Sequence, residues 1–232
     1  MTNRIRFACA LTVLCAALST GALASSMYVV QGIAGRNYAT STDPTFPVDI
    51  LLNDEVCYVH GLPFGSISGP LTFFPGTYDV KVSIANTLAP CSESPLIDQT
   101  VTIDAKSDYS AVLTLNEEGK PTLLTFKNNL SPVAANMARL LFAQAANSPA
   151  LQVILQNTIT KKLYTYAVNP DTLLDVNLPA DDYTIEINQG TTTLVASTPL
   201  RLFSQSANLL YAIGQASNDT VVLETRTLRG VI

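Results

Sequence analysis

The sequence predicts an all-β protein in which two copies of a β-sandwich domain follow a signal peptide. Three observations predict it: alternating polar and apolar stretches separated by turn residues, features of the first half that recur in the second, and an apolar segment near the start. Of the 232 residues, 47% are hydrophobic and 13% are charged. This composition is too apolar for a disordered chain, and it suffices for a buried core in each copy.

The first 24 residues have the three parts of a secretory signal peptide. Arg4 and Arg6 form a basic start, residues 7–18 form an apolar core, and a small-x-small triplet ends at Ala24. The core is shorter than the run of about 20 residues that a membrane-spanning helix needs, which favours a cleaved signal over a retained anchor. We therefore expect cleavage between Ala24 and Ser25, export to the periplasm or the cell exterior, and no membrane span in the mature chain.

Four stretches of the first half are typical of β-strands. Residues 47–52, 77–82, 97–103 and 109–115 alternate between polar and apolar side chains or are rich in β-branched ones, and turn-forming residues separate them. A period of two residues between such turns indicates strands joined in antiparallel order. About seven short strands per copy predict an immunoglobulin-like antiparallel β-sandwich.

Self-comparison predicts that the fold is duplicated. Four features recur in the same order at offsets of 102 to 105 residues: Val48-x-Ile50-x-Leu52 with Leu151-x-Val153-x-Leu155, Tyr78 with Tyr183, Ser94-Pro95-Leu96 with Thr198-Pro199-Leu200, and Tyr109 with Tyr211. We therefore expect a first domain over residues 25–128, a linker over 129–136 and a second domain over 137–232. The polar, proline-containing stretch 127–132 suits a linker.

The repeat also bears on local structure. Residues 137–147 contain alanines that would tolerate a helix, but they occupy the place of residues 27–37, where Tyr28-Val29-Val30 is typical of a strand, so we predict a strand. Tyr78 and Tyr183 each follow a turn and open a strand. Each either donates its hydroxyl back to the turn, as in a tyrosine corner, or is a plain core side chain.

Segments of both halves resemble one known family. They are residues 29–35, 47–50, 64–71, 75–78, 95–98 and 119–123 in the first half and residues 138–153 in the second. These segments resemble DUF4397 domains, which occur in secreted and cell-envelope bacterial proteins. The resemblance implies a compact β-sandwich and no particular reaction. Members usually carry a histidine after the first strand, where this chain has Gln31 and Gln144, so no role of that histidine is carried over.

Cys57 and Cys91 are the only cysteines after the signal peptide, and both lie in the first copy. In an exported chain such a pair most simply forms a disulfide. The alternative is a copper or zinc site that also uses His60, since thiolate and imidazole suit those metals. However, a spacing of three along a strand places Cys57 and His60 on opposite faces, so we expect a disulfide and no metal site.

The residue inventory leaves little for catalysis. His60 is the only histidine, and the segment Gly65-Ser66-Ile67-Ser68-Gly69 lacks the central serine of a nucleophile elbow. A net charge of −5 argues against nucleic acid as a partner. We expect no catalytic residues and no cofactor. Four aromatic residues form either a platform for sugars or ordinary core and cross-strand pairs: Tyr58, Phe74, Tyr164 and Tyr166.

Two functional hypotheses follow. The first is a non-catalytic exported module with a binding or structural role, whose partner is an envelope protein or a glycan. The second is a periplasmic metal-handling or redox protein that uses Cys57, His60 and Cys91.

Overall fold

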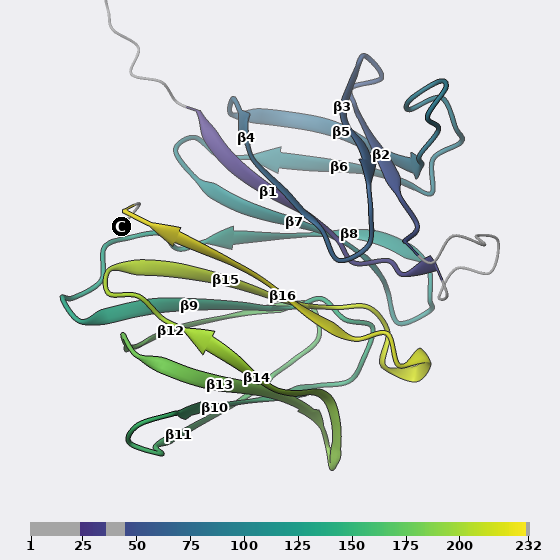
Figure 1. Ribbon diagram of the computed structural model, residues 1–232. Coiled ribbons are helices and arrows are strands. Elements are labelled where there is room, and N and C mark those ends of the chain that lie inside the picture. The colour runs from purple at the N-terminus through teal and green to yellow at the C-terminus, as the bar shows by residue number, and fades with distance from the viewer. Residues whose placement is uncertain (1–23, 36–44, 231–232) are drawn as a thin grey trace, which may run out of the picture.

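The computed structural model describes residues 24–35 and 45–230, which form sixteen strands and one short 3-10 turn, η2 (Ala216–Asn218) (Figure 1). Apart from Ala24, the predicted signal peptide lies outside the described residues. The strands of the first half are β1 (Ser25–Gln31), β2 (Val48–Leu52), β3 (Val56–Leu62), β4 (Ile67–Phe73), β5 (Gly76–Ile84), β6 (Ile97–Ile103), β7 (Asp108–Leu115) and β8 (Pro121–Asn128). Those of the second half are β9 (Met137–Gln144), β10 (Leu151–Asn157), β11 (Leu163–Val168), β12 (Thr172–Pro179), β13 (Asp182–Gln189), β14 (Thr192–Arg201), β15 (Ser206–Ile213) and β16 (Val222–Arg229).

The strands form four sheets of four strands each. In the first half the orders are β4-β1-β7-β8 and β3-β2-β5-β6, and in the second half they are β12-β9-β15-β16 and β11-β10-β13-β14. The second half thus repeats the strand order of the first with every number raised by eight. This confirms the all-β class and the pair of β-sandwiches, each with one strand more than the sequence predicted. Within the described residues, no helix is long and apolar enough to cross a membrane.

One pair of strands in each sandwich departs from the antiparallel expectation. β1 pairs with β7, and β9 pairs with β15, in parallel. Neither pair is joined by a hairpin, because the chain crosses to the other sheet and returns between the two strands. The hairpins β2–β3, β7–β8, β10–β11 and β13–β14 are antiparallel, as the alternation predicted.

The two sandwiches pack against each other through one sheet of each (Figure 1). Side chains of the sheet containing β1, β7 and β8 form a shared buried cluster with those of the sheet containing β9, β15 and β16. The cluster consists of Tyr28, Val30, Val112, Phe126, Leu141, Ala143, Ala145, Ala207, Leu209, Tyr211, Ile213 and Leu228. The contacting sheets are therefore covered on both faces, and this explains why all eight residues of β15 are buried.

β9 shows the consequence for sequence patterning. It is the strand predicted from the repeat, although its alanines favour a helix. All of its residues except Met137 are buried, because one face contributes to the second core and the other to the cluster between the sandwiches. Small side chains such as Ala143 let the two sheets approach closely.

Hydrogen bonds also cross between the sandwiches. The hydroxyls of Ser110 and Tyr211 lie 2.7 Å apart in the buried interface, and the backbone N–H of Gly214 donates to Gly32 O at 3.2 Å. A Cβ at Gly32 would lie 2.5 Å from Leu113 O and 3.1 Å from Ile213 Cβ, so only glycine permits this approach. These contacts pair polar groups of the two sandwiches within a close-packed interface.

The segment between β8 and β9 is held by a buried arginine of β9. The Arg139 guanidinium donates to Asn129 O at 3.1 Å and to Ser131 O at 2.9 Å. On its other side it donates to Asn177 Oδ1 at 3.2 Å and faces Asp175 at 3.3 Å. Residues 129–131 are thereby fixed to β12.

Gln31 and Gln144 occupy equivalent places at the ends of β1 and β9. Each is fully buried, and each side-chain oxygen accepts from the backbone N–H two residues later, at Ile33 and Ala146. Each amide nitrogen donates to the loop that follows, at Phe46 O in the first sandwich. Both glutamines therefore close the loop after the first strand of their sandwich.

The strand register corrects two of the four residue matches in the repeat. Twenty-three positions separate Tyr78 from its partner Val101, but only 17 separate Tyr183 from Leu200, so the first sandwich has six more residues here. Val101, and not Leu96, is therefore the counterpart of Leu200. Tyr109 and Tyr211 do not correspond either: Tyr109 belongs to the core of the first sandwich, whereas Tyr211 faces the other sandwich.

Both tyrosine corners are present. Tyr78 donates its hydroxyl to Phe74 O at 2.8 Å, and Tyr183 donates to Pro179 O at 2.9 Å. The bond spans four residues in each case and closes the turn before β5 or β13.

Candidate functional site: the disulfide-bound loop of the first sandwich

The greater length of the first sandwich lies in the connection between β5 and β6, residues 85–96. In the second sandwich only residues 190–191 connect β13 to β14. The long connection carries Cys91, and the second half has no cysteine. This loop is therefore an addition that the first sandwich makes to the shared fold. We call it the Cys91 loop.

A buried carboxylate anchors the Cys91 loop to the sheet. Asp49 of β2 is 1% exposed. One of its oxygens accepts from Gly61 N at 2.8 Å, and the other accepts from Asn86 N at 3.1 Å and Cys91 N at 2.9 Å. Hydrogen bonds to a charged group are among the stronger ones in proteins. Asp49 thus joins the end of β3 to both ends of the loop segment 86–91.

The Cys91 loop also holds its own shape. Asn86 Oδ1 accepts from the backbone N–H groups of Leu88 and Ala89 at 3.0 and 3.1 Å, and Asn86 Nδ2 donates to Glu93 Oε1 at 2.8 Å. Leu88 is 95% exposed at the tip of this framework. A hollow of about 500 Å³ lies beside it and is lined by Asn86, Leu88, Glu93 and neighbouring residues.

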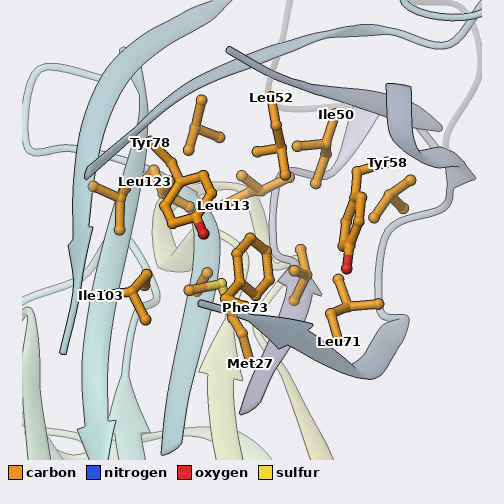
Figure 2. Close-up of a pocket in the computed structure, with 15 residues that line it drawn as sticks. Met27, Ile50, Leu52, Tyr58, Leu71, Phe73, Tyr78, Ile103, Leu113 and Leu123 are labelled. Atoms are coloured by element: carbon orange, nitrogen blue, oxygen red, sulfur yellow. The ribbon is translucent and has the colours of Figure 1, made fainter. Parts of the chain in front are cut away.

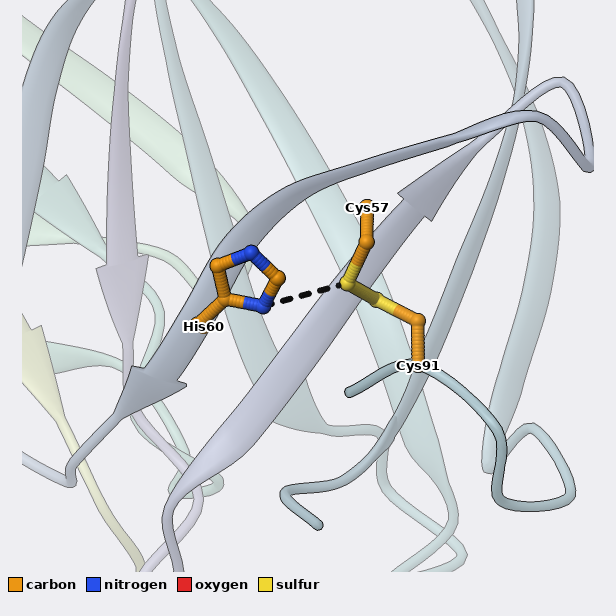
Figure 3. A group of neighbouring side chains, drawn as sticks. All are labelled: Cys57, His60 and Cys91. Carbon is orange, nitrogen blue, oxygen red and sulfur yellow. Dashed lines mark hydrogen bonds between the residues drawn. A yellow bond between two sulfur atoms is a disulfide. The ribbon is translucent and has the colours of Figure 1, made fainter. Parts of the chain in front are cut away.

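Cys57 and Cys91 form the predicted disulfide, with their Cα atoms 5.8 Å apart. His60 points at the bridge (Figure 3), and its Nδ1 lies 3.2 Å from Cys57 Sγ. The three potential ligand atoms lie within 4.8 Å of one another. The structure therefore brings together all three residues of the alternative hypothesis, in the form of a closed disulfide.

The expectation that Cys57 and His60 lie on opposite faces was wrong. Leu51 pairs with Cys57, but the preceding residue Ile50 pairs with Val59, so Tyr58 is an extra residue in β3. A bulge of one residue shifts the alternation of faces by one position. Cys57 and His60 consequently point to the same side.

The four aromatic residues do not form one platform. Tyr58 and the exposed Phe74, 68% accessible, line a hollow of about 180 Å³ at one end of the first sandwich. Tyr164 and Tyr166 lie on β11 and pack against the second core. The aromatic surface therefore reduces to Tyr58 and Phe74.

An apolar cavity of about 30 Å³ lies behind that hollow, inside the first sandwich. Figure 2 shows the rings of Tyr58, Phe73 and Tyr78 at its wall. The Tyr58 hydroxyl donates to Thr72 O at 3.1 Å, and that of Tyr78 is engaged in the tyrosine corner. Its lining side chains are all apolar or aromatic, so the cavity suits no polar ligand.

The predicted cleavage position lies at the start of β1. Ser25 is buried, and its hydroxyl donates to Asp104 O and accepts from Ser107 N at 3.1 Å. A chain that begins at Ser25 retains these contacts, so the prediction of cleavage between Ala24 and Ser25 is compatible with the folded first strand.

Asp49, Asn86 and Leu88 were not among the residues predicted from the sequence. Asp49 occupies the polar position of an alternating strand and therefore resembles a solvent-facing residue. One sequence signal could have revealed the Cys91 loop. The distance from the tyrosine corner to the following strand is longer in the first half than in the second, and this difference marks the inserted loop.

Comparison with known proteins places the chain in a family. The model of a domain of unknown function, DUF4397, matches residues 38–154. Among solved structures, the Bacillus anthracis TIE protein is similar with a TM-score of 0.28 and 10% identity, over 88% of this chain and 34% of that one. This chain thus spans about a third of the TIE protein. No curated protein matches. Since the family model covers half of the chain, in agreement with the motifs of both halves, the chain belongs to the DUF4397 family.

Proposed function

We propose that the protein is a non-catalytic exported module that binds an envelope protein through the Cys91 loop. The observation that carries this proposal is the combination of a loop anchored to the sheet at two places with an apolar side chain at its tip. The anchors are the disulfide and the Asp49 carboxylate, and the Asn86 side chain braces the loop from within. The tip is Leu88.

Anchoring matters because binding orders the groups at an interface. A loop that is already fixed loses less conformational entropy when a partner binds, which favours affinity. Loops on a rigid scaffold are also the usual location of binding residues. A single exposed leucine is unremarkable on a surface, but this one is held out by a segment that the second sandwich lacks.

The chemistry of the tip favours a protein over a glycan. Leu88 offers an aliphatic contact, while Asn86 and Glu93 beside it are already hydrogen-bonded to each other. An apolar centre with a polar rim is typical of protein interfaces. A glycan would stack on aromatic rings, and those lie at the separate Tyr58 and Phe74 hollow.

The non-catalytic part of the proposal is supported by the chemical state of the reactive groups. The only histidine of the chain lies against the disulfide, and both cysteines of the mature sequence are bonded to each other. In this arrangement the two cysteines are held as a disulfide and not as free thiolates, the form in which cysteine acts as a nucleophile.

Site-specific photo-crosslinking tests the proposal. A photoreactive phenylalanine analogue at Leu88 is expected to give a discrete crosslinked species in cells that export the protein, and Leu88→Asp should weaken binding of that species. The matched control is Ile159, which is 73% exposed on the second sandwich. Equal crosslinking from both positions, or none from position 88, would contradict the proposal. A crosslink only from Phe74 would favour a different surface.

A further inference from the structure

We propose that reduction of the Cys57–Cys91 disulfide converts this group into a binding site for a thiophilic d¹⁰ cation, Zn²⁺ or Cu⁺. The ligands are the two thiolates and the imidazole of His60. This site is distinct from the Leu88 contact, and it requires no partner protein.

The ligand atoms already lie close to their required positions. Zn–S bonds are about 2.3 Å long and Zn–N bonds about 2.0–2.1 Å, which places ligand atoms around one ion roughly 3.5 Å apart. Cys57 Sγ and His60 Nδ1 are 3.2 Å apart, and the three atoms lie within 4.8 Å of one another. Only the two sulfurs must separate after reduction, and rotation of the cysteine side chains accomplishes this.

The positions of the three ligands do not depend on the disulfide alone. Asp49 accepts one hydrogen bond from the backbone of Cys91 and another from Gly61, the residue after His60. The Asp49 carboxylate is buried, so water has little access to the acceptor side of these bonds. The loop and the end of β3 therefore stay together when the sulfur–sulfur bond is broken, which preorganises the site.

The reaction balances with a dithiol reductant of the protein or small-molecule class. The reductant supplies two electrons and two protons, becomes a disulfide, and leaves two thiols at Cys57 and Cys91. The cation then displaces the two thiol protons and binds the neutral imidazole. His60 is exposed and both cysteines are partly exposed, so reductant and cation have access.

The ligand set determines the class of cation. Thiolate and imidazole ligands select Zn²⁺ and Cu⁺ over the hard cations Mg²⁺ and Ca²⁺. Three ligands complete a trigonal Cu⁺ site, whereas Zn²⁺ takes water as the fourth ligand. Among the described residues, this is the one group of three or more His, Cys, Asp or Glu side chains arranged to hold a metal.

Cobalt(II) titration of the mature chain tests the inference. Protein reduced with a non-coordinating phosphine is expected to bind one Co²⁺ per chain, with thiolate-to-cobalt charge-transfer absorption that one equivalent of Zn²⁺ abolishes. Oxidised protein should show no such band. Cu⁺ is tested by competition with a chromophoric chelator. His60→Ala should weaken Zn²⁺ binding by at least about tenfold, because removal of a group that supports a metal site typically lowers the metal affinity by that factor or more.

Two further measurements keep the test decisive. Far-ultraviolet circular dichroism of the reduced, metal-free protein should retain the β-sheet signal, since Asp49 and the core remain. Asp49→Asn, which keeps the size of the side chain, should weaken metal binding while the oxidised form of the variant stays folded. Absence of the charge-transfer band in folded, reduced protein overturns the inference, as does an unchanged Zn²⁺ affinity in His60→Ala.

Discussion

Asp49 is the residue on which the candidate site depends most. Its carboxylate accepts three backbone hydrogen bonds, from Gly61, Asn86 and Cys91, in a nearly dry environment. Its counterpart in the second sandwich is Gln152, which is exposed. The difference follows from the Cys91 loop, which covers Asp49 and has no equivalent over Gln152.

Replacing Asp49 with alanine should therefore destabilise the protein markedly. Three partly buried hydrogen bonds are lost together, and we expect the free energy of unfolding to fall by about 3 kcal/mol, roughly 1 kcal/mol for each bond. Urea denaturation of Asp49→Ala and of Gln152→Ala measures this, and the second variant should lie within about 0.5 kcal/mol of the parent. Similar values for the two variants would contradict the anchoring role of Asp49.

The sequence could not have identified Asp49 as buried. In the stretch Val48-Asp49-Ile50-Leu51-Leu52 it occupies the outward-facing position, and the alternation correctly predicts the direction of its side chain. Its burial is decided by a loop more than 35 residues later, which folds back over that face. The cysteine pair was predictable from the expected export signal and the residue count, but the carboxylate beneath it was not.

At the scale of elements, the bulge in β3 decides which side chains meet. A regular strand would have placed His60 on the face opposite Cys57, and the period of two that predicted most strands correctly failed here. A one-residue bulge carries little sequence signal, because its cost and benefit depend on the partner strand. The sequence therefore predicts that most of the strands exist, but it does not predict which side chains of β3 share one face.

β16, the edge strand of the sheet that faces the first sandwich, carries a glutamate with a shifted pKa. Arg226 lies over the ring of Tyr28 at 5.2 Å, and Glu224 lies opposite Tyr211 on the neighbouring strand. Burial raises the pKa of Glu224 above its usual value of 4.5. The folded protein thus binds this proton more tightly than the unfolded chain, so the contribution of Glu224 to stability decreases as the pH rises from 4.5 through the raised pKa.

Glu224→Gln should therefore stabilise the protein at pH 7 and have little effect at pH 4, because the neutral amide removes the cost of holding a half-buried charge. Thermal unfolding across this pH range measures the difference between variant and parent. Glu55→Gln, at an exposed turn, controls for the loss of one negative charge. A Glu224→Gln effect that grows towards low pH would contradict the assigned direction of the pKa shift.

At the scale of the whole molecule, the two sandwiches share an interior. The cluster that contains Val30, Leu209 and Tyr211 is buried as completely as the two cores themselves. The duplication was predictable from recurring motifs, and so was the polar character of residues 127–132. The packing of the two halves against each other was not predictable, because the apolar run 209–213 of β15 is equally typical of a strand buried within one sandwich.

The shared interior predicts that both sandwiches unfold in one transition. Val82 and Val153 are matched core residues, one in each sandwich and each at most 1% exposed, and truncation of either to alanine should cost about 2 kcal/mol. Separation of the halves would expose the common cluster to water, so the two sandwiches are expected to unfold together. Each substitution then lowers the same melting temperature. Calorimetry of either variant should show a single endotherm with equal calorimetric and van't Hoff enthalpies. Independent sandwiches would instead give two endotherms, and each variant would shift only its own. That result would mean that the interface contributes too little free energy to couple the halves. The structure of the Cys91 loop would then depend on the stability of the first sandwich alone.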